Sequence, residues 1–251
     1  MDQNLEKIEI PQPQVTHGGY HDFRRDFNMT TYQTSKMTYV FAFLMVLYVS
    51  QGFLGGQEDF LSTLNEGMRM FIYITTIAFQ WFIFGIMYIT MRTENTDLSS
   101  LALNRIRTID FAWSFATLLV LAVTGVAMSL FVEFIGHPMP GELAMLLPQD
   151  LLGKFVWVGV SFTAGFCEET LFRGYIMTRI REMGKFSNWT IPVIVSSIAF
   201  GLPHAYQGIG GLIVITSLGV VFALIYIRTK SLWPAVIAHS LLDFLNIFFP
   251  Q

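Results

Sequence analysis

Residues 155–175 read FVWVGVSFTAGFCEETLFRGY, an apolar run that carries the adjacent carboxylates of Glu168 and Glu169 and the guanidinium of Arg173. Hydropathy assigns this run to a lipid bilayer. Each ionisable side chain near a bilayer centre costs roughly 2.5 to 3.5 kcal/mol on insertion scales, so such groups are retained where they pair, line a wet cavity or do chemistry. We therefore predict a helix over residues 154–185, at least partly embedded in the membrane, that carries a functional site.

The spacing of the three charged residues predicts their partners. On an α-helix, Glu169 and Arg173 lie within about 40° of each other, whereas Glu168 and Arg173 lie about 140° apart. Glu169 is therefore the predicted ion-pair partner of Arg173. Glu168 has no cation on its own face and is the predicted general base. A structural salt bridge is the alternative interpretation, because the same pattern is common on solvated helix faces.

The composition excludes a soluble domain of this size. Of 251 residues, 53% are hydrophobic, 15% are aromatic and only 13% are charged, which is typical of an integral membrane protein. A net charge of -3 gives no sign of nucleic-acid binding. The single cysteine, Cys167, excludes an internal disulfide; it is also a candidate thiol nucleophile, although no cation is certain to stabilise its thiolate.

Apolar segments divide the rest of the chain. Seven are interpreted as membrane spans, over residues 38–54, 70–91, 111–132, 154–185, 189–202, 209–227 and 232–249. The predicted fold is an all-α, polytopic membrane helix bundle of about seven transmembrane helices, with a polar site within the membrane among helices 4, 5 and 7.

Three regions follow from these spans. Residues 1–36 form a polar N-terminal tail that we place in the cytoplasm, and residues 37–135 hold transmembrane helices 1 to 3 with an interfacial connector. Residues 150–251 hold transmembrane helices 4 to 7 and the polar site.

The basic residues predict the orientation in the membrane. With the N-terminus in the cytoplasm, the basic residues on that side are Lys7, Arg24, Arg25, Lys36, Arg92, Arg105, Arg107, Arg179, Arg181, Lys185, Arg228 and Lys230. Only Arg69 and Lys154 then face outward. Cytoplasmic loops carry an excess of lysine and arginine, so we predict a multi-pass protein of the cell membrane with its N-terminus in the cytoplasm and its C-terminus outside.

Six ionisable side chains in the second half are expected to converge, because six isolated groups in a bilayer would cost on the order of 15 kcal/mol. They are Glu168, Glu169, Arg173, His204, His239 and Asp243. His239 and Asp243 are four residues apart, and Asn246 falls on nearly the same helix face. Such a set fits a site that activates water or a metal site. The zinc-binding pattern His-Glu-x-x-His is absent, so we predict no cofactor, while a divalent metal stays open.

Three motifs now give a specific resemblance. Cys167–Gly174 resembles the Glu-Glu-x-x-x-Arg motif of the CAAX-protease and bacteriocin-processing family of intramembrane proteases, also called the Abi family. Phe200–His204 is similar to its second motif, Phe-x-x-x-His, and Trp233–Asp243 resembles its third. The resemblance covers roughly residues 150–248, whereas residues 1–110 match only as generic membrane helices.

The resemblance implies an intramembrane endopeptidase whose catalytic core is residues 150–251. It implies that Glu168 and His204 activate a water, that Glu169 and Arg173 hold the glutamate-bearing helix, and that His239 with its i+4 partner stabilises the oxyanion. The eukaryotic CAAX branch has Asn where this chain has Asp243. An ionised Asp cannot donate to an oxyanion, so Asp243 is expected to orient His239 and favour its protonated form, with Asn246 a possible helper.

The implied partners are a membrane-inserted peptide or protein substrate and the lipid bilayer, with no nucleic acid. Two other classes of function fit the same polar cluster. One is a non-catalytic membrane scaffold, such as a bacteriocin-immunity partner. The other is a proton-coupled transporter, which the absence of an evident inverted repeat disfavours.

Overall fold

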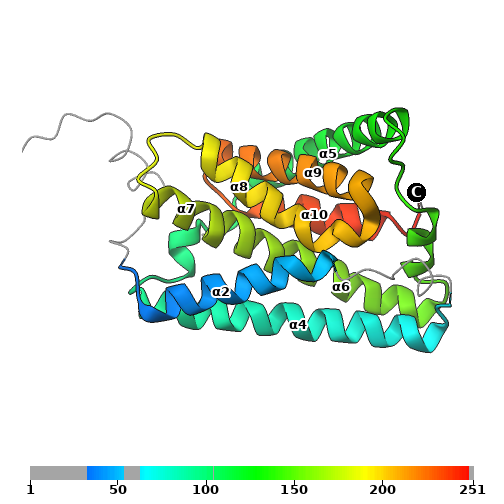
Figure 1. Cartoon of the computed structure of the whole chain (residues 1–251), viewed down its shortest axis with the longest axis horizontal. Coiled ribbons are helices and arrows are strands. Elements are labelled where there is room, and N and C mark those ends of the chain that lie inside the picture. Colours follow the sequence, from blue (N-terminus) through cyan, green and yellow to red (C-terminus); the bar gives the residue numbers. More distant parts are fainter. Residues whose placement is uncertain (1–32, 54–62, 104, 249–251) are drawn as a thin grey trace, which may run out of the picture.

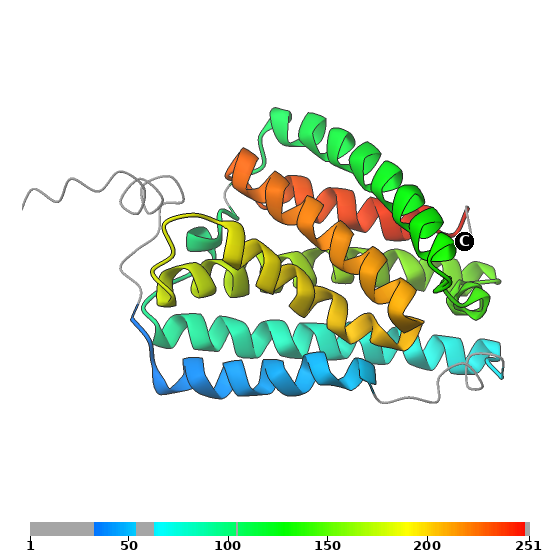
Figure 2. The same cartoon turned by 45° about the horizontal axis from the view of Figure 1, so that its top comes forward.

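The computed structural model describes residues 33–53, 63–103 and 105–248. These residues form a bundle of helices with no strand among them, which confirms the predicted all-α class (Figures 1 and 2). The α-helices are α2 (Lys36–Ser50), α4 (Glu66–Thr93), α5 (Thr108–Phe134), α6 (Leu151–Glu169), α7 (Thr178–Met183), α8 (Thr190–Gly201), α9 (Gly208–Thr229) and α10 (Trp233–Leu245). A π-helical segment, η4 (Thr170–Met177), joins α6 to α7, and a 3₁₀ turn, η5 (Leu202–Gln207), joins α8 to α9.

Five helical segments in the described part of the chain are long and apolar enough to cross a membrane, so the predicted count of seven is not confirmed. They are Lys36–Phe53, Glu66–Thr93, Thr108–Phe134, Leu151–Met183 and Thr190–Thr229. The last segment contains η5, where α8 and α9 fold back on each other (Figure 2). With 12 and 13 residues, α8 and α10 rise only about 18 and 20 Å, which is less than the roughly 30 Å of hydrocarbon.

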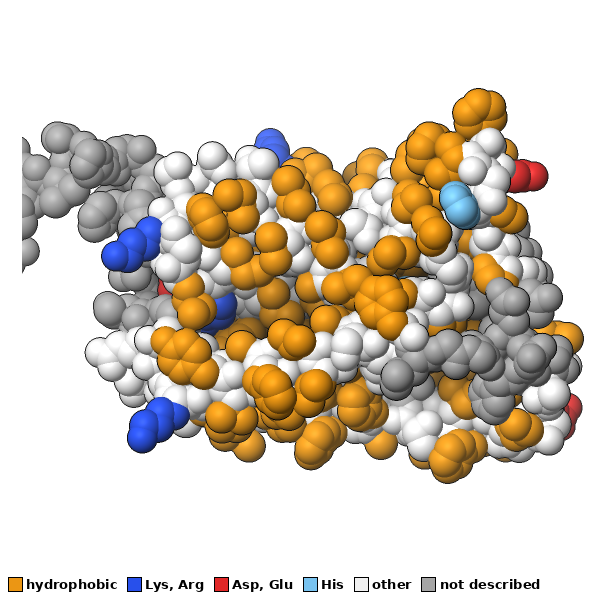
Figure 3. All heavy atoms as spheres, in the orientation of Figure 1, with side chains coloured by type: hydrophobic (Ala, Val, Ile, Leu, Met, Phe, Trp, Pro, Cys, Tyr) orange, Lys and Arg blue, Asp and Glu red, His pale blue; other side chains and the backbone are white. Residues whose placement is uncertain are grey.

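The outer faces of the long helices are hydrophobic, as expected of a multi-pass membrane protein. Large apolar side chains such as Phe71, Phe115, Val123 and Phe155 are each more than 60% exposed. Figure 3 shows this apolar surface, with the lysine and arginine side chains of the visible face toward the end of the bundle where α2 begins. Lipid is the solvent that suits such a surface.

Polar caps set where the long helices begin. The Asn65 side chain accepts a hydrogen bond from the Met68 backbone at the start of α4. The Asp150 side chain accepts one from the Gly153 backbone at the start of α6, with a distance of 2.7 Å. These bonds satisfy backbone donors that have no partner inside the helix. The cap at Asp150 starts the long segment Leu151–Met183, in which Glu168 lies near the middle.

Glycines bring the helices of the second half close together. A Cβ atom at Gly165 of α6 would overlap Ser240 and approach the Val236 carbonyl of α10. At Gly219 of α9, it would come within 3.1 Å of the Arg173 guanidinium. Small residues allow membrane helices to pack with their backbones in near contact. These two positions therefore press α10 and α9 against the helix that carries the adjacent glutamates.

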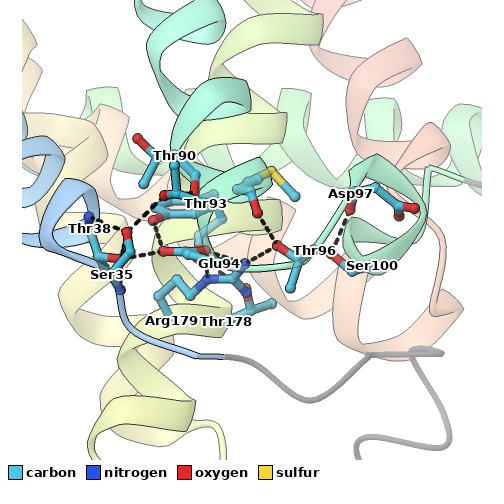
Figure 4. A network of polar contacts seen from close by, with 12 residues as sticks. Ser35, Thr38, Thr90, Thr93, Glu94, Thr96, Asp97, Ser100, Thr178 and Arg179 are labelled. Atoms are coloured by element: carbon cyan, nitrogen blue, oxygen red, sulfur yellow. Dashed lines mark hydrogen bonds and ion pairs between the residues drawn. The ribbon is translucent and has the colours of Figure 1, made fainter.

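A second buried polar network ties the N-terminal helices to α7 (Figure 4). Glu94, at the end of α4, is fully buried. Its Oε2 atom accepts hydrogen bonds from Nη2 and Nε of Arg179 at 2.8 and 3.0 Å. Its Oε1 atom accepts from the hydroxyls of Tyr175 at 2.6 Å and Thr38 at 2.8 Å. One carboxylate thus joins α2, α4, η4 and α7, a function for Arg179 that the charge pattern did not predict.

The interfacial connector between α4 and α5 contains the 3₁₀ turn Leu98–Leu101. Leu101 is fully buried and packs with Met87, Met91 and Phe172. Ile106, farther along this connector, is 41% exposed. Most of the predicted N-terminal tail, residues 1–32, lies outside the described part of the chain.

Candidate active site

The adjacent glutamates end α6, and the helix changes type directly after them. Residues Thr170–Met177 form a π-helix, where a regular α-helix was predicted. Short π-helical segments are rare and occur often at functional sites. A π-helix has more residues per turn than an α-helix, so side chains five residues apart lie closer to the same face of it. The α-helical angle between Glu168 and Arg173 used above is therefore too large for this segment.

Glu169 makes the predicted ion pair and a second contact that was not predicted. Its Oε1 atom lies 3.0 Å from Nη1 of Arg173 and 2.9 Å from Nδ1 of His239. Glu169 and Arg173 are both fully buried. One carboxylate oxygen thus accepts from two different helices, so Glu169 links η4 to α10.

Arg173 has further partners that explain how a buried guanidinium is accommodated. Its Nη2 atom donates to the Gly219 carbonyl at 3.0 Å. Its Cζ atom lies 4.1 Å from the ring centroid of Phe200 and 5.1 Å from that of Phe222, so both aromatic faces attract the cation. Phe200 is the first residue of the second motif. The motif was used to find His204, but its Phe could also have suggested a partner for Arg173.

His239 lies between two carboxylates on the face predicted from its spacing to Asp243. Its Nδ1 atom contacts Glu169, and its Nε2 atom lies 3.6 Å from Oδ2 of Asp243. That second distance is an ion-pair distance and too long for a hydrogen bond. The ring stacks on Phe222 with centroids 5.0 Å apart. The aromatic contact and the two carboxylates fix the orientation of the imidazole.

His204 lies in η5 and is half-buried. Its Nδ1 atom lies 3.2 Å from the Phe200 carbonyl, and its ring stacks beside Tyr206. A carbonyl oxygen only accepts, so this contact assigns the proton to Nδ1 and leaves Nε2 as an acceptor in the neutral ring. No hydrogen bond or ion pair joins His204 to Glu168 in the described part of the chain.

Glu168 has a different partner, on the first half of the chain. Nε2 of Gln80, in α4, donates to Oε1 of Glu168 at 2.7 Å. Glu168 and Gln80 also line a small pocket together with Tyr48, Phe79, Ile83, Phe84, Cys167 and Leu171. The sequence analysis did not include Gln80 because it considered only ionisable side chains within the apolar segments, and residues 70–91 contain no charged side chain. Gln80 is the only amide side chain in that span, and this was the available signal.

The predicted site residues therefore fall into two groups. Glu169, Arg173, His239 and Asp243 form one chain of direct contacts. Glu168, His204 and Asn246 make no hydrogen bond or ion pair to that chain among the described residues. Asn246 is the residue that follows the last turn of α10.

Two observations concern the thiol nucleophile and the metal site that the sequence also suggested. Cys167 is buried, with 4% of its surface exposed, and it lines the same pocket as Glu168. Within residues 33–53, 63–103 and 105–248, no three His, Cys, Asp or Glu side chains group closely enough to hold a metal ion.

The fold and the site define a multi-pass helical membrane protein in which carboxylates, histidines and an arginine lie buried or half-buried among the helices of the second half. Residues 151–245 match the model of the family described as type II CAAX prenyl endopeptidase Rce1-like, which confirms the resemblance predicted from the motifs. The match covers all six ionisable residues that were predicted for the site and ends one residue before Asn246.

One curated relative also matches. The chain is 31% identical over 83 residues to a protein of Bacillus subtilis (strain 168) named "Putative membrane peptidase YdiL". That alignment spans 33% of this chain and 32% of the relative, so it covers about a third of each. No solved structure matches the chain.

Proposed function

We propose that the protein is an intramembrane endopeptidase that hydrolyses a peptide bond of a membrane-associated peptide or protein with a water activated by Glu168 and His204. The observation that carries this proposal is the buried polar cluster at the middle of the segment Leu151–Met183, where isolated charges would be costly. The match of residues 151–245 to a peptidase family supports the same reaction class.

Glu168 and His204 have different roles toward the attacking water. An ionised Glu168 accepts the proton of the attacking water, and the hydrogen bond from Gln80 orients its carboxylate. His204 uses Nδ1 for the Phe200 carbonyl, which leaves Nε2 to accept from the water or later to pass a proton to the leaving amine. Hydrolysis is complete when the hydroxide has bonded to the carbonyl carbon, the C–N bond has broken and the amine has gained a proton.

His239 stabilises the charge that develops on the carbonyl oxygen. Glu169 and Asp243 flank its ring and stabilise a positive charge on it by Coulomb attraction. The Nε2–Asp243 distance of 3.6 Å leaves room for this N–H group to turn toward an oxyanion. Asp243 thus orients His239, and Glu169 with Arg173 holds the glutamate-bearing helix against α10. Asn246 is a second donor from the end of α10.

The basic residues at the ends of the helices support the orientation that we propose in the membrane. Lys36 begins α2, Arg92 lies in the last turn of α4, Arg107 precedes α5 and Arg228 lies in the last turn of α9. Figure 1 shows that α2 and α5 begin, and α4 and α9 end, toward the same end of the bundle. We assign this end to the cytoplasm, which places the protein in the cell membrane with its N-terminus inside and its C-terminus outside.

The decisive experiment compares the peptides in membranes from cells that carry the wild-type protein or Glu168→Ala. A protease produces fragments that are present with wild type and absent with the variant, at equal protein levels. A scaffold, including a bacteriocin-immunity partner, would keep its phenotype in Glu168→Ala. If no fragment depends on Glu168 while the phenotype persists, the proposal is wrong and the scaffold function takes its place.

A further inference from the structure

We propose that Gln80 belongs to the hydrolytic site: its amide nitrogen holds Glu168 in position, and its amide oxygen accepts a hydrogen bond from a backbone N–H group of the peptide substrate. This inference rests on the proposed function and adds to it a residue of the N-terminal half of the chain. Gln80 lies on α4, outside residues 151–245 that match the peptidase family.

The first step of the argument is the contact with Glu168. The distance of 2.7 Å between Nε2 of Gln80 and Oε1 of Glu168 is short for an N–H···O bond and typical of a charged acceptor. It is the one side-chain hydrogen bond to Glu168 among the described residues. An ionised carboxylate only accepts, so the nitrogen of the Gln80 amide faces Glu168 and the oxygen faces away.

The second step concerns that oxygen. Oε1 of Gln80 is buried and has no hydrogen-bond partner in the described part of the chain. Buried polar atoms are nearly always paired, so an unpaired one needs an explanation, such as a ligand or a water that is bound there. Because Oε1 only accepts, its missing partner is a donor.

The third step identifies the donor. Gln80 and Glu168 line the same pocket, whose other walls include the apolar side chains of Phe79, Ile83 and Phe84. A peptide whose carbonyl carbon is attacked by a water on Glu168 must bring its own backbone N–H groups to this place. An extended peptide bound at the open side of this pocket, beside Glu168, supplies the donor and covers the apolar walls.

The chain offers a matched control at the next residue. Nε1 of Trp81 donates to the Thr163 hydroxyl at 3.2 Å, so it also makes one hydrogen bond from α4 to α6. Trp81→Phe removes this bond and keeps an aromatic ring beside Phe166. It therefore reports what the loss of one α4–α6 bond does without any change at Glu168.

The first test measures kcat and KM on a peptide whose cleavage depends on Glu168. Gln80→Met keeps an unbranched side chain, and we expect it to lower kcat/KM by about 10- to 100-fold, as misplacement of a reacting group does. Trp81→Phe should change kcat/KM by less than about threefold, and both variants should keep the wild-type yield and melting temperature. If Gln80→Met accumulates poorly, Gln80→Asn takes its place, because the shorter side chain cannot reach both partners. The same decrease in kcat/KM at wild-type yield and melting temperature is expected of it. Wild-type kcat/KM in a folded variant overturns the inference.

The second test asks whether Gln80 acts through Glu168 and through the substrate. In a Glu168→Gln background and at saturating substrate, adding Gln80→Met should change the residual kcat by less than about twofold and raise only KM, because the contact with the substrate is then the one that is lost; a general packing defect would lower kcat by the same factor as in wild type. The peptide is also made with a single N-methyl group at each backbone amide near the cleaved bond. One N-methyl group should slow the wild type at least tenfold and Gln80→Met less than twofold.

Equal N-methyl effects in both proteins would show that a water, and not the substrate, pairs with Oε1. That outcome overturns the second half of the inference. The failure of the proposed function looks different, because then the wild-type protein itself shows no cleavage that depends on Glu168.

Discussion

Replacing Glu169 with Gln separates the two adjacent glutamates more sharply than any other change. Glu169 is fully buried and accepts from Arg173 at 3.0 Å and from His239 at 2.9 Å. Glu169→Gln keeps the shape of the side chain but removes the negative charge that both partners face. Arg173 then keeps the Gly219 carbonyl and the ring faces of Phe200 and Phe222 as its neighbours.

The expected cost follows from this geometry. Breaking a buried ion pair by removing one partner destabilises a protein by about 3 to 5 kcal/mol, against total stabilities of about 5 to 15 kcal/mol. For a chain of this size, 1 kcal/mol shifts the melting temperature by about 2 to 4 °C, which gives a decrease of roughly 6 to 20 °C. We therefore expect Glu169→Gln to accumulate poorly in the membrane and to lose activity with its fold.

The assay compares four variants by detergent-extracted yield, melting temperature and peptide cleavage. Arg173→Gln should resemble Glu169→Gln, and the double variant should recover part of the yield because neither charge is then left alone. Glu168→Gln should keep the wild-type melting temperature and lose about 10²- to 10⁴-fold in rate, as loss of a general base does. If Glu169→Gln folds and cleaves normally while Glu168→Gln is unstable, the two roles are reversed and our reasoning is wrong.

The remaining predictions concern other parts of the molecule. Glu94→Gln removes the charge that Arg179 faces, so we expect a lower melting temperature with the turnover of the folded fraction retained; a kcat that falls as far as the yield would contradict this. Cysteines introduced near Arg105 and Lys185 should react with a membrane-impermeant reagent only in permeabilised cells, whereas one near Gly141 should react in intact cells; labelling of the site near Arg105 in intact cells would reject the orientation. Cleavage at near-neutral pH should be largely insensitive to chelators, and a loss that one specific ion restores would instead make Glu168, His204 and His239 candidate metal ligands.

Local spacing predicted two contacts within single helical segments correctly, for a geometric reason. Glu169 and Arg173 are four residues apart, as are His239 and Asp243, and both pairs meet in the structure. A helix brings such neighbours together whatever surrounds it. The pair at Glu169 formed although the segment after it is π-helical, a distortion that the residue types did not reveal.

Contacts between distant helices could not be predicted in the same way. His239 was paired with Asp243 from its spacing, yet its shorter contact is with Glu169, 70 residues away. Gln80 reaches Glu168 over 88 residues, and Arg179 reaches Glu94 over 85. No periodicity relates such positions, because their proximity depends on which helix faces pack together.

The sequence by itself determined the solvent, the helical class and the composition of the polar cluster, since hydropathy and the high cost of charges in lipid act on residue types alone. The tertiary structure decided how that cluster is divided. Glycines at positions 165 and 219 let α10 and α9 approach the helix that carries the adjacent glutamates, so Glu169 gained His239 as a second partner beside Arg173. Adjacent side chains on a helix point toward different neighbours, so Glu168 does not share the partners of Glu169. The packing of α4 against α6 instead brings Gln80 within hydrogen-bond distance of Glu168.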